Sequence, residues 1–377
     1  MDPRVCQFEQ ILDEGLAARP SVRNGGPDAI FSAAHIAELG YAIKGEAADG
    51  LVKGLEIIAP AVIDGDPASK VSAETVLEDL EFGHRYWQLR ELLYYTYNAP
   101  GSIGWSFEGN RVRIHYEDRS LPRQFFIASN NTFLESIRLF EGREDPTEIE
   151  ELIRGIPEDS RSPAAGRALE LIEEEAAMKL SAYFNLFDPD FDAPLEGHSY
   201  RVLMEVNRIM LSKALWHRYH TRVNGSQGAV LADIDELVDS IIKSSDLLDP
   251  ESARWALTFM SYGKDVRKRR EDPVYFSLYR LPPQESVLLL PHHFCTWESL
   301  VSLMRLIALR DPDGYLRHFS GPVGSGLTKR LATAFETAGF ECQTDVSMRR
   351  FGAHLPDIDL VVISHEPTLG FVVLLCE

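Results

Sequence analysis

Three acidic residues near the end of the sequence have the spacing of a metal site. Asp357 and Asp359 stand two positions apart at the start of an apolar run, and Glu377 directly follows another apolar run. Alternate residues of a β-strand share one face, so the two aspartates would lie on the same side of a sheet. Carboxylate oxygens are the ligands that Mg²⁺ prefers. The pattern therefore points to a Mg²⁺ or Mn²⁺ site with Asp359 and Glu377 as the metal ligands.

A helix is expected just before these carboxylates. Apolar residues recur at helical spacing between positions 327 and 339. The apolar stripe consists of Leu327, Leu331, Phe335 and Ala338. Gly339 is suited to end the helix. Residues 319–326 are rich in glycine and proline, which predicts a loop in front of it.

Three strands are predicted after the helix, over residues 340–350, 357–364 and 371–376. The last two are almost continuously apolar, as in strands that are buried on both faces. A short turn joins them, so they can pair as an antiparallel hairpin. That pairing would bring Asp359, near the start of one strand, close to Glu377 at the end of the other. Ordinary solvated strand ends would also contain such residues, and D-x-D alone is a weak signal.

The helix followed by three strands, the segment PDIDLVVI and the final LLCE resemble the PD-(D/E)XK nuclease superfamily. The resemblance covers about residues 320–377 and implies a restriction-endonuclease-like fold. It implies that Asp359 is the family's metal-binding aspartate, with Asp357 as second choice, and that Glu377 is the glutamate of the Glu-x-Lys motif. Glu336 would match the acidic residue often present on the preceding helix. The implied activity is metal-dependent hydrolysis of phosphodiester bonds, with DNA as the expected substrate.

The family's lysine would stand two positions after Glu377, where the sequence ends. The helix and strand that complete the family core would follow as well. We therefore expect the chain to be a truncated fragment of a longer Mg²⁺-dependent endonuclease, and to be inactive by itself. The alternative is a non-enzymatic helical adaptor protein with a degenerate nuclease-like tail.

Basic residues provide candidates for contact with a nucleic-acid backbone. Arg349 and Arg350 lie on the strand before the aspartates, and Lys264, Arg267 and Lys268 belong to the densest basic run. Side chains of this kind make most contacts with phosphate. A solvated helix end or strand face would have the same composition.

The preceding part of the sequence reads mainly as helices. Helical patterns cover residues 72–98, 147–155, 163–180, 197–222, 228–245, 250–263 and 294–310, and alternation around Gly109-Asn110 predicts a β-hairpin over 102–116. The basic and aromatic residues within 201–222, Lys213 and Trp216 among them, stand on a helix that also packs. The expected fold class is a mostly α accessory region with a small hairpin, followed by an incomplete α/β nuclease-like domain. The expected domains are an acidic lobe (1–190), a helical middle region (191–318) and the nuclease-like part (319–377).

The composition of the chain indicates where the protein is located and which partners it can bind. The formal net charge is -20, and residues 1–200 hold 36 acidic against 18 Lys or Arg residues, while 201–377 hold 22 against 20. The acidity therefore belongs to the first lobe, which is a candidate surface for a protein partner. Four widely spaced cysteines and the absence of an apolar span or signal pattern favour a reducing cytoplasm and exclude a membrane partner.

Overall fold

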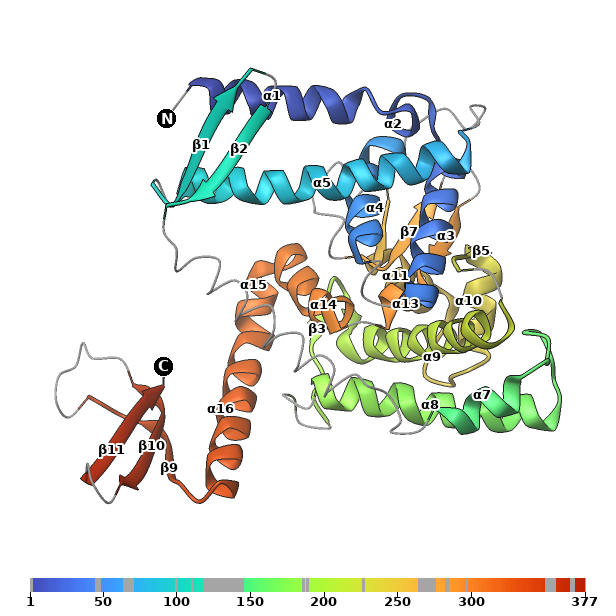
Figure 1. Ribbon diagram of the computed structural model, residues 1–377. Helices are drawn as coiled ribbons and strands as arrows, with labels where there is room; N and C mark the ends of the chain where they lie inside the picture. The colour runs from blue at the N-terminus through green and yellow to red at the C-terminus, as the bar shows by residue number, and fades with distance from the viewer. Residues whose placement is uncertain are drawn as a thin grey trace. The chain divides into compact units, whose positions relative to one another are not determined.

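The computed structural model describes most of the chain. The residues it describes are 3–44, 49–63, 71–98, 101–109, 111–117, 146–184, 187, 190–225, 228–263, 276–281, 285–295, 297–349, 357–366 and 370–376. Within them the chain is mostly helical with small sheets (Figure 1), which confirms the expected predominance of helices. None of the helices in these residues is both long and apolar enough to cross a membrane.

The chain forms two compact units. The first comprises Met1–Lys179 and Val202–Leu306, and the second comprises Leu180–Arg201 and Ile307–Glu377. The first unit thus combines the two helical regions that the sequence analysis separated at residue 190. The second unit contains residues 319–377, together with residues just before 319 and the segment 180–201. The boundaries of the two units could not be predicted from local composition, because each unit combines segments that are far apart in the chain.

The first unit begins with a small layer of helices and one hairpin. Its elements are α1 (Pro3–Ala17), α2 (Pro20–Asn24), α3 (Pro27–Lys44), α4 (Asp49–Val62), α5 (Ala73–Asn98), β1 (Ile103–Glu108) and β2 (Arg111–Tyr116). The hairpin has the expected antiparallel register, from Ile103 opposite Tyr116 to Glu108 opposite Arg111. Val5, Leu12 and Leu93 form a buried cluster against which aromatic residues of α1, α5 and the hairpin pack.

Two glycines set the distance between α4 and α5. A Cβ atom on Gly54 would lie 2.1 Å from the carbonyl oxygen of Leu80, and one on Gly83 would lie 2.8 Å from the Gly54 carbonyl oxygen. Both helices therefore approach at a point where only a residue without a side chain fits. Nearby, the buried Asp79 carboxylate accepts a hydrogen bond from the Ser21 backbone N–H at 2.8 Å and pairs with Arg19, so that α2 is fixed to α5.

The rest of the first unit is built around a four-stranded sheet. Its strands are β5 (Val230–Asp233), β6 (Ser261–Tyr262), β7 (Leu278–Leu281) and β8 (Ser286–Leu289), in the order β5-β8-β7-β6. Only β6 and β7 run parallel. The helices are α7 (Thr147–Ile153), α8 (Pro163–Phe184), α9 (Tyr200–Asn224), α10 (Ile234–Ile242), α11 (Pro250–Phe259), α13 (Pro291–Phe294) and α14 (Trp297–Arg310). Most of the expected helices are confirmed to within a few residues.

One expected helix, over 228–245, is wrong in its first part. Val230–Asp233 forms strand β5, and the helix begins only at Ile234. The Asp233 side chain accepts hydrogen bonds from the backbone N–H groups of Asp235 and Glu236, which caps α10. The preceding residues pair with β8 instead, since Val230 lies opposite Leu289 and Ala232 opposite Val287. Long-range strand pairing therefore overrode the apparent helical pattern.

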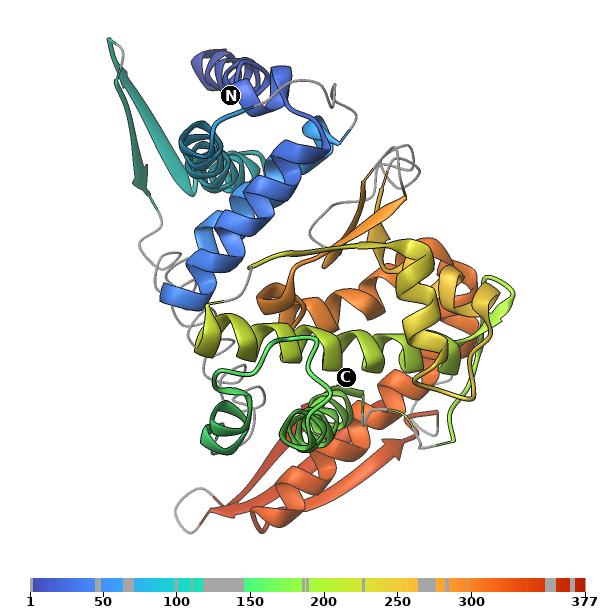
Figure 2. The same ribbon diagram turned by 90° about the vertical axis from the view of Figure 1, so that its right-hand side faces the viewer.

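The second unit contains one long helix and a three-stranded sheet. Its elements are β3 (Pro194–Leu195), β4 (His198–Ser199), α15 (Pro312–Gly314), the π-helical turn η3 (Tyr315–Phe319), α16 (Ser320–Thr337), β9 (Glu341–Val346), β10 (Ile358–Glu366) and β11 (Gly370–Cys376). The sheet has the order β11-β10-β9, and both pairings are antiparallel. This confirms the expected helix followed by a hairpin-connected set of strands. Figure 2 shows α16 beside the three strands.

The packing of α16 differs from the expectation in two ways. The loop predicted over 319–326 is helical, because the turns that begin at Pro312 continue through it and override its low helix propensity. The predicted apolar stripe is not the buried one, since Leu327 and Leu331 are 50% and 39% exposed. Ala332 packs instead with Leu360 and Val362 of β10, beside Phe335. A small residue at the centre of the contact lets the helix approach the sheet closely.

Strand β11 forms one edge of this sheet. Val373, Leu374 and Leu375 are 54%, 49% and 59% exposed, so β11 exposes apolar side chains on both faces. Its expected burial on both faces is therefore not observed for these three residues.

Aromatic rings hold the other end of the second unit together. Phe319 is fully buried, and its ring lies 5.2 to 6.3 Å from the rings of Phe187, Phe191, Tyr200 and Tyr315. This cluster fixes Phe187, Phe191 and Tyr200 to the start of α16.

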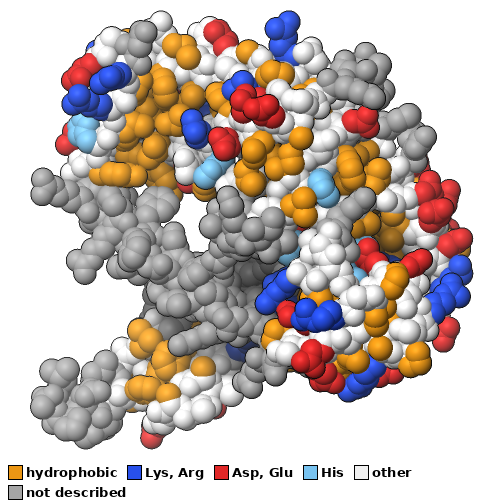
Figure 3. Space-filling view, turned by 45° about the vertical axis from the view of Figure 1, so that its right-hand side comes forward, with side chains coloured by type: hydrophobic (Ala, Val, Ile, Leu, Met, Phe, Trp, Pro, Cys, Tyr) orange, Lys and Arg blue, Asp and Glu red, His pale blue; other side chains and the backbone are white. Residues whose placement is uncertain are grey.

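Over the visible face of the described residues, acidic and basic side chains are interspersed (Figure 3).

Candidate functional site

The two aspartates at the start of β10 have different surroundings. The Oδ1 atom of Asp357 accepts hydrogen bonds from the Ser347 hydroxyl at 3.0 Å and from the Met348 backbone N–H at 3.2 Å. Asp357 therefore fastens the residues after β9 to the beginning of β10. These hydrogen bonds give Asp357 a structural task, and its expected place in the catalytic set stays a prediction.

Asp359 is exposed on β10, while the next residue, Leu360, is buried against α16. It lies between the pairs Ile358–Val346 and Leu360–Thr344 of the β9–β10 ladder. Asp345 stands between the same two pairs on β9, with a φ angle of 53°. Two carboxylates therefore stand at corresponding positions of neighbouring strands, where like charges repel unless a cation or solvent screens them. Asp345 is absent from the predicted site residues, because it lies inside a predicted strand and belongs to no motif.

Several predicted site residues lie outside the residues that the structure describes. These are Glu377, Arg350, Lys264, Arg267 and Lys268. The described part of the β10–β11 register ends with Leu360 opposite Cys376. In the sequence Asp359 comes just before Leu360, and Glu377 comes just after Cys376. The antiparallel hairpin on which the predicted pairing depends is therefore present up to these positions.

The remaining predicted residues are exposed. Glu336 lies in the last turn of α16, where its backbone carbonyl accepts a hydrogen bond from Gly339. Arg349 lies in the turn after β9. Among the residues that the structure describes, no group of three His, Cys, Asp or Glu side chains is close enough to hold a metal. Asp345 and Asp359 have carboxylate oxygens of the kind that Mg²⁺ prefers, and a role of Asp359 in holding a metal stays a prediction.

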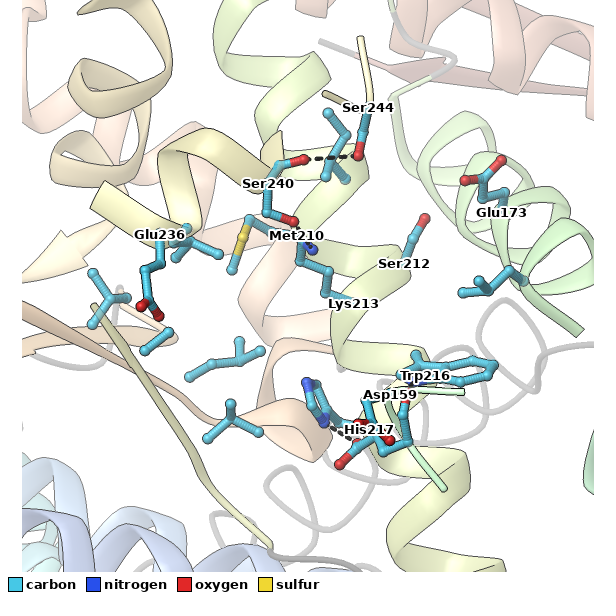
Figure 4. A pocket seen from close by; sticks show the side chains of 18 of the residues that line it. Asp159, Glu173, Met210, Ser212, Lys213, Trp216, His217, Glu236, Ser240 and Ser244 are labelled. Atoms are coloured by element: carbon cyan, nitrogen blue, oxygen red, sulfur yellow. Dashed lines mark hydrogen bonds and ion pairs between the residues drawn. The ribbon is translucent and has the colours of Figure 1, made fainter. Parts of the chain in front are cut away.

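A cavity of about 660 Å³ lies in the first unit, between α8, α9, α10 and one face of the sheet (Figure 4). Its floor is the pair of strands β5 and β8, where Val230 lies opposite Leu289 and Ala232 opposite Val287. Ile209 and Met210 of α9 and Leu237 of α10 extend this apolar wall. The cavity could not be predicted from spacing along the chain, because its lining comes from six separate segments.

One amine projects into this cavity. The Nζ atom of Lys213 donates a hydrogen bond to the Ser240 hydroxyl at 2.7 Å (Figure 4). Burial lowers the pKa of Lys213, and no carboxylate offsets that effect. The half-buried Lys213 amine therefore has one hydrogen-bond partner among the described residues, a neutral hydroxyl.

The other charged groups around the cavity are paired or exposed. His217 forms an ion pair with Glu158, whose backbone carbonyl accepts a hydrogen bond from Trp216 at 3.1 Å. The Arg208 guanidinium makes two hydrogen bonds to Glu205, at 2.8 and 2.9 Å. The exposed carboxylates are those of Asp159, Glu173 and Glu236.

A third group of ionisable side chains is buried in the same unit. Glu38 of α3 accepts hydrogen bonds from the backbone N–H groups of His292 at 2.6 Å and His293 at 3.3 Å. Burial raises the pKa of Glu38 to about 8 and lowers the pKa of His292 to about 3. Both groups are therefore held in neutral forms over much of the range between these values. Their burial suits a structural role better than contact with a substrate.

A second buried network adjoins it. The Tyr219 hydroxyl donates a hydrogen bond to Glu175 at 2.8 Å, and the Lys179 amine lies 3.7 Å from the same carboxylate. Burial raises the pKa of Cys295 to about 11, so this thiol stays protonated and unreactive at neutral pH.

Comparison of the chain with protein-family models, with curated proteins and with solved structures gave no match. The functional assignment therefore depends on the geometry of the chain itself.

Proposed function

We propose that this chain supplies metal ligands of a nuclease of the PD-(D/E)XK type, which hydrolyses phosphodiester bonds of nucleic acid, with DNA as the expected substrate. The observation that carries the proposal is the position of Asp359. It is an exposed carboxylate at the start of the central strand of an antiparallel β9–β10–β11 sheet with α16 packed on it.

The residues at this position suit Mg²⁺ or Mn²⁺. Asp359 and Asp345 stand between the same two pairs of the β9–β10 ladder, and a divalent cation bound there would relieve the repulsion between their charges. Glu377 remains the proposed second ligand of the family pattern. When bound, the metal would supply an activated water and would neutralise charge on the phosphate.

The neighbouring residues would position this site. Asp357 binds Ser347 and Met348, and so holds the end of β9 against the start of β10. Arg349 follows Met348 and is exposed, which suits a contact with the phosphate backbone. Asp359 would therefore act on the substrate through a metal, and Asp357 would act through the backbone.

The test is hydrolysis of supercoiled plasmid DNA by the protein expressed from its complete reading frame, with Mg²⁺ or Mn²⁺. Asp359→Ala should reduce cleavage by at least about 100-fold, the range reached when metal sites are disturbed. Asp313→Ala changes an exposed aspartate of α15 in the same unit and serves as the control. Equal cleavage by wild type and Asp359→Ala would refute the assignment of that residue.

Failure of the wild-type protein to cleave any nucleic acid, together with failure to bind Mn²⁺, would favour the second candidate. This is a non-enzymatic helical adaptor with a degenerate nuclease-like tail. Two further roles remain proposals for the first unit. It would bind DNA, or it would bind a protein partner through its acidic surface.

A further inference from the structure

The cavity of the first unit has an apolar interior with one cationic group. Its buried lining includes Ile209, Met210, Leu237, Val287 and Leu289, whose side chains are 1% to 9% exposed. A cavity of about 660 Å³ with this lining is of the size and character that proteins use for small organic ligands. The apolar surface favours a ligand with a hydrocarbon portion, because burial of that portion releases water.

Lys213 is the residue that would bind an anionic group of the ligand. Its amine is held at 2.7 Å from the Ser240 hydroxyl, on the facing helix α10. A half-buried ammonium group without a carboxylate partner loses part of its hydration, and an anionic ligand would offset that loss. Ser240 could then donate its hydroxyl hydrogen to the same anion. The two side chains therefore form a preset site for one carboxylate group.

The exposed carboxylates limit the charge of the ligand. Asp159, Glu173 and Glu236 line the cavity and are exposed to solvent. They repel polyanions such as nucleic acid or inorganic phosphate more strongly than they repel a single carboxylate. Salt weakens their effect on a monoanion, whereas the contact with Lys213 is partly shielded from solvent.

We infer that this cavity binds a small monocarboxylic acid with an apolar chain, whose carboxylate pairs with Lys213 and Ser240 while the chain lies against the β5–β8 wall. This site belongs to the first unit and is independent of the proposed nuclease site. Trp216 and Met210 contribute further apolar surface to the same cavity.

Isothermal titration of the whole chain with octanoate and with octanamide tests the inference. The two probes differ little except in charge. Octanoate should bind saturably to one site, and at least about ten-fold more tightly than octanamide, as expected for a charge-assisted contact. Equal affinities, absence of binding by both probes, or saturable binding of inorganic phosphate at this site would overturn the inference.

Lys213→Met keeps the length of the side chain and removes its charge. It should abolish the preference for octanoate over octanamide, whereas Lys243→Met, which alters an exposed lysine just after α10, should retain the preference. Ser240→Ala should weaken octanoate binding several-fold and leave octanamide binding unchanged. An unaltered preference in Lys213→Met would overturn the role of Lys213. The comparison of acid with amide in the wild type needs no variant, so it decides the matter even where Lys213→Met unfolds.

Discussion

The carboxylate of Glu38 accepts a hydrogen bond from the backbone N–H of His292 at 2.6 Å, across 254 positions of sequence. It joins α3, near the start of the chain, to α13, which follows the four-stranded sheet. Because the carboxylate is fully buried, the contact contributes to stability and responds to pH. The first unit therefore depends on residues from both of its separated segments.

Glu38 should make the stability of the first unit fall with rising pH. Its pKa in the folded chain, about 8, lies above the model-peptide value of 4.5. The stability it contributes is therefore complete below about pH 4.5 and is lost as pH rises through 8, with a slope of at most about 1.4 kcal/mol per pH unit. Urea unfolding between pH 5 and about 9 should show this slope in the wild type and a smaller one in Glu38→Gln. Equal slopes would contradict the prediction.

His292 should have the opposite effect on the acidic side. Burial lowers its pKa from 6.5 to about 3, so the stability it contributes is complete above about pH 6.5 and is lost as pH falls toward 3. His292→Gln removes the titration and should flatten the acid limb of the same urea series. An unchanged acid limb in this variant would show that other groups dominate.

Gly54→Ala should destabilise the first unit by about 2 kcal/mol or more, because the new methyl group would overlap the Leu80 carbonyl oxygen. Gly166→Ala is the matched control, since a Cβ atom there meets nothing within 4 Å and the position lies on α8. That control should stabilise the chain by about 0.5 to 1 kcal/mol through helix propensity. Thermal unfolding of both variants would distinguish these outcomes, and a neutral Gly54→Ala would contradict the close helix contact.

Asp357 and Asp359 should respond oppositely to removal of their charge. Asp357→Ala removes two hydrogen bonds and should lower the stability of the second unit by about 1 kcal/mol. Asp359→Asn relieves repulsion with Asp345 and should raise stability by about 0.5 kcal/mol in the presence of EDTA. Melting temperatures with EDTA and with Mn²⁺ would show this, and Mn²⁺ should stabilise the wild type more than Asp359→Asn.

Phe319→Ala should destabilise the second unit by about 3 to 5 kcal/mol, because it empties the centre of an aromatic cluster. Leu316→Ala is the control on the same helical turn, where the side chain is 68% exposed. A melt followed by near-ultraviolet circular dichroism would report the loss of ring packing. Similar effects of the two substitutions would argue against the cluster as a core.

Sequence reasoning identified the elements that local patterns determine. The hairpin near Gly109, the helix from Pro250 to Phe259 after its Asp249 cap, and the order of α16, β9, β10 and β11 all followed from turn, cap and period signals. The expected place of Asp359 at the start of β10 also agrees with the structure.

The features that were missed depend on distant segments. Strand β5 forms because β8 pairs with it, and the buried side of α16 is decided by Leu360 and Val362 rather than by its own largest residues. The cavity around Lys213 combines three helices with two strands and a loop. Neither its enclosure nor the corresponding positions of Asp345 and Asp359 on two strands can be read from spacing along the chain.

The edge formed by β11 has a practical consequence. Val373, Leu374 and Leu375 are apolar and exposed on a strand whose outer hydrogen-bonding groups lie at the margin of the sheet. Such an edge is a template for pairing with another extended chain. Concentrated solutions of this chain should therefore self-associate and precipitate through these residues, and Leu374→Lys should improve solubility without loosening the contact between Ala332 and β10.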